Sequence, residues 1–347
     1  MKFEKSITVE KFINEALYNK KKGFYNKKNP FGHKGDFITS PGISSLFSEM
    51  IGIWIISYWE KLGKPKNFNV IELGPGDGSL CKIILKVFAK FPEFNKSVRI
   101  FLHEKSELLK KIQERNISSR KIKWIDDFEV IKKGPVVFFG NEFFDALPIK
   151  QYEIKGKKVF ERFLNFNKND SPQIKLKKVD SKTIAILKKF GLLRFDGLVE
   201  YPNIGLKKLD GIVKKIIKHS GGILLVDYGY LKDRSGNSLQ SVFKHKYNNL
   251  FKNIGDADIT SLVNFSLLKK YFNSKKLITN KVVTQGYFLK KLGILQRAEI
   301  ISRGMTFKEK TDLYYRLDRL LNPKNMGENF KVLFAQKKRE KFSMGFS

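Results

Sequence analysis

Short apolar segments alternate with helix-like segments through the middle of this chain, and no other feature restricts its fold as strongly. The apolar runs have the length and composition of buried strands, and the stretches between them place apolar residues at helical spacing. The strand-like runs are residues 69–73, 98–104, 122–125 and 136–140, and the helix-like runs are residues 79–90 and 107–115. This alternation predicts an α/β fold, with a mostly parallel sheet and helices on both faces.

Two further segments interrupt this pattern. Residues 152–165 alternate in hydrophobicity around Lys155-Gly156-Lys157, as the strands of an antiparallel hairpin do. The core pattern then resumes, and we expect helices at 206–219 and 263–272 and strands at 222–227, 277–284 and 331–336. We therefore predict a core over residues 66–347 with insertions at about 150–204 and 286–325, the second one helical.

Residues 1–65 precede this core and contain two predicted helices. Thr8 can cap a helix over residues 8–19, and residues 44–62 form a second, strongly apolar helix. Between them, residues 23–41 are rich in Gly, Asn and Pro and are predicted to form a loop. The N-terminal part is therefore expected to be a helical segment with one long loop.

Composition excludes several classes of protein. Hydrophobic residues make up 41% of the 347, which is ample for a buried core, so global disorder is excluded. Cys81 is the single cysteine, which excludes a disulfide scaffold, an iron–sulfur cluster and a Cys-rich zinc site. The four histidines lack HxxxH or HxH spacing, so no metal site is predicted.

The charge is strongly positive, with 68 basic against 34 acidic residues and a net charge of +34. Lysine is spread through every segment, so we interpret it as a general surface bias and not as a specific nucleic-acid surface. The most apolar stretch, Ile51–Tyr58, is far shorter than the roughly 20 residues that span a bilayer. No signal peptide is recognised, so a cytoplasmic protein without membrane insertion is expected, and its oligomeric state stays open.

A glycine-rich turn joins the first predicted core strand to the helix that follows it. Gly74, Gly76 and Gly78 form a GxGxG pattern, in which glycines let a ligand approach the main chain and the helix N-terminus offers N–H groups. The dinucleotide fingerprint would need a third glycine where Ser79 stands, and the Gly-Lys-Ser/Thr of a phosphate loop is absent. The pattern therefore favours a nucleoside that carries no pyrophosphate.

Two glutamates flank this turn. Glu72 stands two positions before Gly74, and Glu104 ends the second strand, where a carboxylate reaches ribose hydroxyls in doubly wound sheets. The nucleoside predicted from this arrangement is S-adenosylmethionine, with Glu72 facing its cationic methionine end and Glu104 holding its ribose. The competing interpretation is a plain glycine turn flanked by core glutamates.

Polar side chains follow the fourth predicted strand. Asn141, Glu142 and Asp145 stand there beside two phenylalanines, at the strand ends that form the ligand crevice in open α/β sheets. These groups are costly to bury without a partner, so the segment fits a pocket for a cation or an amide. Glu142 and Asp145 are three residues apart and can face the same site. The alternative is a capping turn in which Asn141 or Asp145 starts a helix.

Motifs spread over most of the chain resemble the MidA family of class I methyltransferases, the bacterial relatives of a mitochondrial complex I assembly factor. The glycine turn alone is a weak signal, but the full set is specific. The matching motifs are Lys22-Gly23-Phe24-Tyr25, Gly35-Asp36-Phe37-Ile38-Thr39-Ser40-Pro41, Glu72-Leu73-Gly74-Pro75-Gly76, Asn141-Glu142-Phe143-Phe144-Asp145-Ala146-Leu147-Pro148, Val226-Asp227-Tyr228-Gly229-Tyr230, Asp258-Ile259-Thr260, Thr284-Gln285-Gly286-Tyr287-Phe288-Leu289 and Lys331-Val332-Leu333.

The resemblance implies a Rossmann-like, seven-stranded methyltransferase sheet and S-adenosylmethionine as methyl donor. It also implies a protein-arginine acceptor on a peripheral-arm subunit of complex I, modified to symmetric dimethylarginine during assembly. The N-terminal loop is expected to cover the cofactor. The predicted cofactor-binding residues are Glu72, Gly74, Gly76, Gly78, Glu104, Asp36, Thr39 and Ser40, and the predicted catalytic residues are Glu142, Asp145 and Asn141.

Three positions depart from the family pattern. Gly42 stands where the family usually has Glu, and Leu262 and Asn264 stand where it has His and Asp. The identity of the acceptor therefore stays open, whereas the cofactor motifs are intact.

An arginine acceptor would need a carboxylate in the pocket. A guanidinium is protonated at neutral pH, and a carboxylate that accepts two of its N–H groups fixes its plane and leaves the remaining nitrogen to attack. Glu142 is predicted to make this grip, with Asp145 in support. His245 is an alternative proton acceptor or a structural histidine.

Two other functions stay open. An RNA methyltransferase would suit the charge, but two features count against it. Methylation at pyrimidine C5 usually uses a cysteine nucleophile, and the single cysteine, Cys81, lies on a helix just past the glycine turn. Methylation of base amino groups usually uses an Asn/Asp-Pro-Pro-aromatic motif, and Glu142 replaces its first proline. A non-catalytic chaperone of complex I assembly would keep the fold and bind the cofactor without transferring methyl groups.

Overall fold

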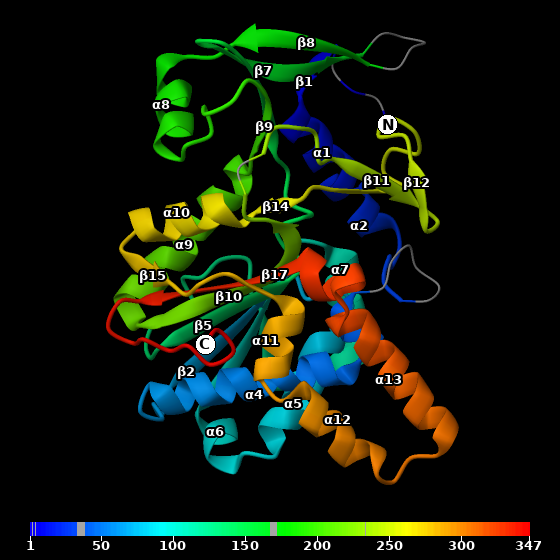
Figure 1. The fold of residues 1–347 in the computed structure, drawn as a ribbon, viewed down its shortest axis with the longest axis vertical. Helices are drawn as coiled ribbons and strands as arrows, with labels where there is room; N and C mark the ends of the chain where they lie inside the picture. Colours follow the sequence, from blue (N-terminus) through cyan, green and yellow to red (C-terminus); the bar gives the residue numbers. More distant parts are fainter. Residues whose placement is uncertain (2, 4, 33–38, 167–171, 233) are drawn as a thin grey trace.

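A mixed β-sheet forms the centre of the molecule in a computed structural model that describes residues 1, 3, 5–32, 39–166, 172–232 and 234–347 (Figure 1). Its strands are β2 Phe68–Leu73, β3 Val98–His103, β4 Ile122–Trp124, β5 Val136–Asn141, β10 Gly221–Tyr230, β14 Val263–Asn264, β15 Leu277–Thr279, β16 Val283–Thr284 and β17 Phe330–Lys337. Seven of them follow the path β15-β17-β10-β5-β2-β3-β4, while β14 pairs with β10 and β16 pairs with β17. The four pairings from β10 to β4 are parallel, whereas β17 runs antiparallel to both its neighbours. The predicted α/β fold is confirmed.

Helices cover both faces of this sheet (Figure 1). They include α4 Ser45–Lys61, α5 Ser79–Ala89, α7 Glu107–Ile117, α9 Asn203–His219 and α10 Phe265–Ser274. Along β5, Val137 and Phe139 pack in the cluster that contains α4 and α5, and Val136 and Phe138 pack in the cluster that contains α9 and α10. Successive side chains of a strand point to opposite faces, so a strand buried on both faces reads as one continuous apolar run.

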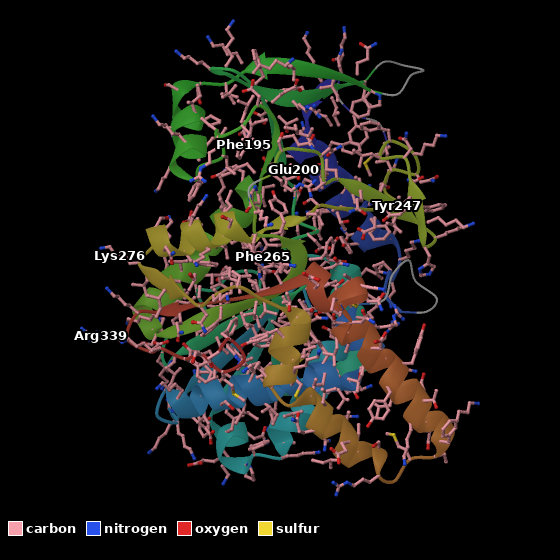
Figure 2. All side chains as sticks on the ribbon, in the orientation of Figure 1. Phe195, Glu200, Tyr247, Phe265, Lys276 and Arg339 are labelled. Carbon is pink, nitrogen blue, oxygen red and sulfur yellow. The ribbon has the colours of Figure 1, made fainter. Side chains whose placement is uncertain are left out.

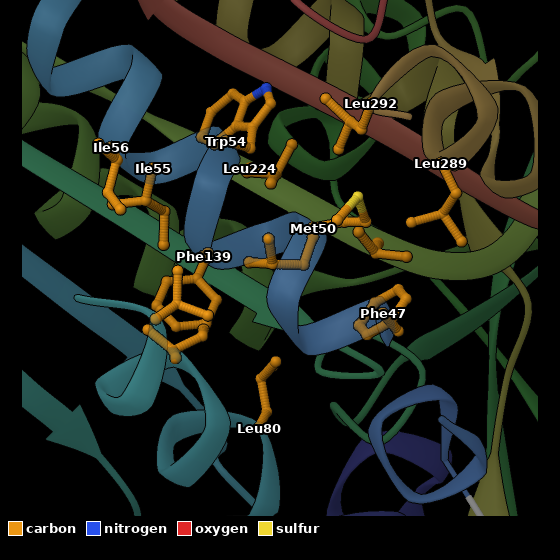
Figure 3. Packing of buried hydrophobic residues seen from close by; sticks show 14 of the residues in the cluster. Phe47, Met50, Trp54, Ile55, Ile56, Leu80, Phe139, Leu224, Leu289 and Leu292 are labelled. Atoms are coloured by element: carbon orange, nitrogen blue, oxygen red, sulfur yellow. The ribbon is translucent and has the colours of Figure 1, made fainter. Parts of the chain in front are cut away.

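Helix α4 is the most deeply buried helix of the N-terminal part, and Figure 3 shows its packing. Phe47, Met50 and Trp54 project from it toward the sheet, where Leu224 of β10 lies close by. The Trp54 ring meets the Phe334 ring edge-on, with centroids 4.8 Å apart. This helix therefore anchors the N-terminal segment to the central sheet.

A second sheet joins the first insertion to the N-terminus. It contains β1 Ser6–Thr8, β6 Lys150–Lys155, β7 Lys158–Asn165, β8 Gln173–Lys178 and β9 Gly197–Tyr201. Strands β6 and β7 form the hairpin predicted around Gly156, and β1 pairs with β7 through Ser6 and Asn165. Helix α8 Ser181–Lys189 packs on this sheet, with Leu187 in the small apolar cluster between them. The N-terminal strand is therefore part of the inserted sheet, a pairing that no local pattern indicated.

Two predicted elements differ from the structure near the C-terminal half. The helix expected from residue 263 begins at Phe265, because the Asn264 side chain accepts a hydrogen bond from Leu267 N at 2.9 Å and caps the helix there. Val263 and Asn264 instead pair with β10. The strand expected over 277–284 is divided into β15 and β16, and both parts pair with β17.

The segment predicted as the second insertion is helical. It contains α11 Gln285–Lys291, α12 Ile294–Ser302 and α13 Phe307–Leu321, which lie beside α4 and α5 in Figure 1. Thr306 and Glu309 form a reciprocal capping box at the start of α13. Within the described ranges, no helix combines the length and the apolar character that a bilayer crossing requires.

Candidate functional site

A cavity of about 730 Å³ opens at the carboxyl ends of β2, β3, β5 and β10. In open α/β sheets this edge is where ligands bind, and the volume lies within the range of small-molecule sites. Helix α1 Val9–Tyr18 and the small sheet of β11 Gln240–Phe243, β12 Lys246–Asn248 and β13 Asp258–Thr260 stand around it. Of the predicted site residues, Glu72, Gly74, Gly76, Glu104, Thr39, Asn141, Glu142 and Asp145 line the cavity.

The glycine turn has the backbone geometry that its sequence predicts. Gly74, Gly76 and Gly78 have φ angles of 62°, 59° and 83°, which side chains rarely adopt. A Cβ atom on Gly74 would lie 2.9 Å from Phe143 Cδ2, and one on Gly76 would lie 3.0 Å from Phe31 Cζ. Gly78 is the N-cap of α5, so the N–H groups of that helix start where the turn ends. The turn therefore leaves main-chain atoms accessible to a ligand.

Glu72 presents an unpartnered carboxyl oxygen to the cavity. Its side chain is 3% exposed, and its Oε2 atom has no hydrogen-bond partner among the described residues. Burial, with repulsion from Asp77 and Glu104, raises the pKa of Glu72 to about 8. A positively charged group in the cavity would stabilise the ionised carboxylate. The methionine end of the predicted nucleoside carries such a group.

Glu104 is held in place by hydrogen bonds. Its Oε1 accepts from Lys105 N at 2.7 Å and from Ser106 N at 2.8 Å, and its Oε2 accepts from Gln113 Nε2 at 3.2 Å. Burial raises the pKa of Glu104, and the hydrogen bonds oppose that shift. A fixed carboxylate beside a glycine turn fits the two hydroxyls of a ribose. The residues present therefore fit S-adenosylmethionine, whose sulfonium supplies an activated methyl group when it is bound.

Glu142 and Asp145 lie together in the part of the cavity that follows β5. Glu142 Oε1 accepts from Ser40 N at 3.2 Å and from Asn141 Nδ2 at 3.0 Å. Burial, with repulsion from Asp145, raises the pKa of Glu142 to about 8. The Tyr228 hydroxyl donates to Asp145, whose pKa burial raises to about 6. Asp145 Oδ1 has no hydrogen-bond partner among the described residues.

Glu142 and Asp145 line one cavity, as their spacing indicated. Residues 142–145 form a turn rather than a helix, and Glu142 has a φ angle of 51°. Glu142 N donates to Val226 O at 2.9 Å, which holds the chain in this turn. The carboxylates share the cavity because of the tertiary contacts of the turn and not because of helical spacing.

Asp227 is the residue that shapes this turn, and sequence reasoning assigned it no role. It is 2% exposed, and its Oδ2 accepts from the main-chain N–H groups of Phe143 at 3.1 Å, Phe144 at 2.8 Å and Asp145 at 3.3 Å. Burial, with repulsion from Asp145, raises its pKa. Asp227 belongs to the matched motif at residues 226–230 and ends the strand predicted over 222–227. That position is the signal that could have identified it.

Gln113 has a similar position near the glycine turn and was also missed. It is fully buried, and its Nε2 donates to Gly76 O at 2.8 Å as well as to Glu104. Its Oε1 accepts from Trp124 Nε1 at 2.8 Å. Nothing in the local sequence distinguishes this glutamine from others on helical surfaces.

Lys208 and His103 form a third group that the sequence did not indicate. Lys208 contacts His103 Nε2, while His103 Nδ1 lies 3.1 Å from Ile125 O. Burial and the Lys208 charge lower the pKa of His103 to about 4, and burial lowers the pKa of Lys208 to about 8. Both side chains line the cavity.

The described end of the N-terminal loop reaches the cavity and Glu142. Ser40 is fully buried, its main-chain N–H donates to Glu142 Oε1, and its Oγ lies 3.3 Å from Gln285 Oε1. Thr39 lines the cavity, and Asp36 lies outside the described residues. The loop therefore contacts the Glu142 carboxylate directly.

The positions that depart from the family pattern have clear locations. Leu262 lines the cavity, Asn264 caps α10 and Gly42 is exposed on the short helix α3 Ser40–Ile43. His245 lies exposed at the turn between β11 and β12 and does not line the cavity. Cys81 is buried on α5, as expected.

Comparison with known proteins agrees with this geometry. The model of a family described as S-adenosyl-L-methionine-dependent methyltransferases matches residues 50–283. The chain is 30% identical to the mitochondrial protein arginine methyltransferase NDUFAF7 of Homo sapiens, over 93% of this chain and 78% of that protein. It is 28% identical to the NDUFAF7 homolog of Drosophila melanogaster, over 94% of this chain and 80% of that protein.

The fold is also similar to that of a protein from Burkholderia thailandensis crystallised with S-adenosyl-homocysteine. The TM-score is 0.81 at 19% identity, covering 99% of this chain and 89% of that chain. A native crystal structure from the same organism gives a TM-score of 0.78 at 18% identity. At this identity the likeness shows the fold, whereas the family model and the human relative show the family. The chain therefore belongs to the MidA-like family of S-adenosyl-L-methionine-dependent methyltransferases, and S-adenosylmethionine is its cofactor.

Proposed function

We propose that this methyltransferase modifies an arginine side chain of a protein. The observation that carries the proposal is a group of hydrogen-bond acceptors at one end of the cavity. Asn141 Oδ1 and Asp145 Oδ1 have no partner among the described residues, and they stand beside the Glu142 carboxylate. A guanidinium carries a positive charge and several N–H donors in one plane, so it matches both the charge and the unsatisfied acceptors.

Each residue of this group has a distinct part in the proposed reaction. Glu142 grips two guanidinium N–H groups and fixes the plane of the acceptor. Asn141 accepts a further N–H group. Asp145 Oδ1 accepts the proton that leaves the attacking nitrogen, and the Tyr228 hydroxyl orients that carboxylate. Glu72, the three glycines, Glu104 and Thr39 are proposed to hold the cofactor, and Ser40 holds Glu142.

The names of the relatives support an arginine acceptor, since both are called protein arginine methyltransferases. By the same resemblance we propose that the substrate is a peripheral-arm subunit of respiratory complex I, that the product is symmetric dimethylarginine and that the reaction takes place in the cytoplasm during assembly. An RNA substrate is disfavoured by the cavity itself, because the carboxylates around the acceptor end would repel phosphates.

The test is to incubate the purified chain with methyl-labelled S-adenosylmethionine and complex I subunits of its host. We expect label on one subunit and, after hydrolysis, dimethylarginine identified by mass spectrometry. A parallel reaction contains RNA of the host in place of the subunits, and label in that RNA would favour the RNA methyltransferase. Cofactor binding without transfer to any subunit would favour the non-catalytic chaperone.

A further inference from the structure

The charge reverses between the cavity and the surface beside it. Carboxylates line the cavity, among them Glu142, Asp145 and Asp258. The adjoining residues 19–32 and 240–257 together contain eight lysines and one carboxylate, Asp256. The whole chain has only twice as many basic as acidic residues, 68 against 34, so these two segments are basic beyond the general bias.

The two segments form one continuous surface. Lys27 pairs with Asp256, and the Lys28 Nζ lies 6.0 Å from the centre of the Phe243 ring. A Cβ atom on Gly255 would lie 2.2 Å from Lys22 O, so the two main chains are in contact. Figure 1 shows the β11–β12 hairpin beside the N-terminal helices. We call this surface, residues 19–32 with 240–257, the basic rim.

One face of the hairpin sheet leads from the cavity to the basic rim. In the register of the sheet, Val242 of β11 pairs with Asp258 on one side and with Tyr247 on the other. Cross-strand partners project to the same face, and Val242 and Asp258 line the cavity. Tyr247 is 86% exposed and lies at the outer edge of the molecule in Figure 2. An aromatic side chain therefore continues the cavity wall outward.

The tip of the hairpin carries positively charged side chains. They stand in a turn whose positive φ angles favour asparagine and glycine. Lys244 and His245 have φ angles of 49° and 62°, in a two-residue turn that favours Asn-Gly. Lys244, His245 and Lys246 are all exposed. The turn thus holds basic groups next to Tyr247, at the end of the face that leads into the cavity.

We infer that the β11–β12 hairpin docks an acidic polypeptide segment that flanks the acceptor side chain. The inference rests on the proposed protein substrate and states its sequence class: a cationic acceptor with acidic neighbours. Charge complementarity carries it, because the basic rim attracts acidic residues while the cavity attracts the cation. A second copy of this chain is disfavoured as the occupant by its net charge of +34. RNA would meet the basic rim but would be repelled by the cavity.

The test uses two synthetic peptides with the same central arginine, one flanked by Asp and Glu and the other by Lys. Binding to the full chain is measured by fluorescence anisotropy at low salt. We expect the acidic peptide to bind at least about tenfold more tightly, and Lys244→Glu with Lys246→Glu to remove that preference. Tyr247→Ala should weaken the acidic peptide as well. The matched control is Lys157→Glu with Lys158→Glu at the β6–β7 hairpin, which should leave binding unchanged.

The same experiment separates this inference from the proposed function. An acidic peptide that binds through the hairpin but is never methylated would contradict the arginine acceptor and support the docking surface. Methylation with equal binding of both peptides, or with no effect of the hairpin variants, would overturn the docking surface alone. A short single-stranded RNA that displaces the acidic peptide and binds more tightly would overturn it in favour of a nucleic-acid surface.

Discussion

The two ends of the cavity are each organised by one buried polar side chain, but these side chains differ in charge. At the cofactor end, the neutral Gln113 donates to Gly76 O and Glu104 Oε2. At the acceptor end, the carboxylate of Asp227 accepts from three consecutive main-chain N–H groups, those of residues 143–145. Gln113 thus satisfies a carboxylate, whereas Asp227 is a further acidic group close to Glu142 and Asp145, and burial disfavours its ionised form.

This difference indicates how far the hydrogen bonds of each end are satisfied before its ligand binds. Glu104 has three hydrogen-bond donors in the protein, so its carboxylate is already oriented. Asp145 keeps an unpartnered oxygen, and its repulsion adds to the burial that raises the pKa of Glu142. We interpret the acceptor end as a site whose charge is balanced by its cationic substrate.

The largest effect is expected for Glu142→Gln, which removes a charge from the acceptor end and keeps the shape. A lost charged hydrogen bond costs about 1.5–3 kcal/mol, so two of them made mainly in the transition state predict a fall in methyl transfer of roughly 10²–10⁴. Binding of S-adenosylmethionine, measured by calorimetry, should be retained. If this variant keeps more than about a tenth of the rate, Glu142 is not the grip and Asp145 becomes the candidate.

Gly76→Val tests the cofactor end. The new side chain would meet Phe31 in the cavity and would force a valine to a φ angle of 59°. We expect cofactor affinity to fall by at least about 100-fold, with a loss of stability of about 1–2 kcal/mol from the backbone.

Gly156→Val is the matched control for this change. Gly156 has a φ angle of 57° on the β6–β7 hairpin, and a Cβ atom there has nothing within 4 Å. It should lose similar stability and bind the cofactor normally. Equal loss of cofactor binding in both variants would mean that strain, and not the cavity, is responsible.

Asp227→Ala tests whether the acceptor end depends on its buried carboxylate. Three main-chain N–H groups would lose their acceptor, which predicts a loss of about 3 kcal/mol in the free energy of unfolding, measured with urea. The rate of methyl transfer should fall by a larger factor than the affinity for the cofactor. Asp227→Asn keeps one acceptor oxygen and should lie between the wild type and the alanine variant. An unchanged unfolding midpoint for Asp227→Ala would contradict its role in the turn.

Gln113→Leu makes the corresponding change at the cofactor end. It leaves Glu104 with its two main-chain donors, so we expect cofactor affinity to fall by only about tenfold. The Michaelis constant for the acceptor should stay the same. A larger effect on the acceptor than on the cofactor would reverse our assignment of the two ends.

The smallest effect is a pH dependence that distinguishes the two carboxylates. Glu142 has a raised pKa of about 8, so below that pH a cationic acceptor must displace a proton, and its affinity should fall by up to about tenfold per unit. In the folded chain Glu142 keeps its proton up to that pH, whereas in the unfolded chain it ionises near its ordinary value of 4.5. Stability should therefore fall as pH rises from 4.5 to 8.

Glu142→Gln is the control for this pH dependence as well. It should abolish the acceptor slope and make the fall in stability with pH less steep, while the part due to Glu72 remains. The pH dependence of cofactor binding should remain, because Glu72 also has a pKa raised to about 8. The measurement is acceptor and cofactor affinity of Glu142→Gln between pH 6.5 and 9. Loss of pH dependence in both affinities would contradict separate roles for Glu142 and Glu72.

Strongly periodic segments were predicted well, and their ends were predicted less well. The helix expected over residues 79–90 is α5 Ser79–Ala89, and the strand expected over 136–140 is β5 Val136–Asn141. A strand that is buried on both faces is a continuous apolar run, so it can be identified from the sequence. The start of α10 was misplaced because Asn264 caps it, and a single side-chain hydrogen bond overrides an apolar pattern.

The sequence by itself determined the α/β sheet, the glycine turn and the residues that follow the first, second and fourth core strands. These features depend on periodicity and on backbone freedom, which are local properties. The tertiary structure alone decided that β1 joins the inserted sheet, that Gln113 and Asp227 organise the cavity and that Ser40 contacts Glu142. These contacts join residues 37 to 159 positions apart, and a polar side chain acquires such a role only when folding removes water and leaves one partner within reach.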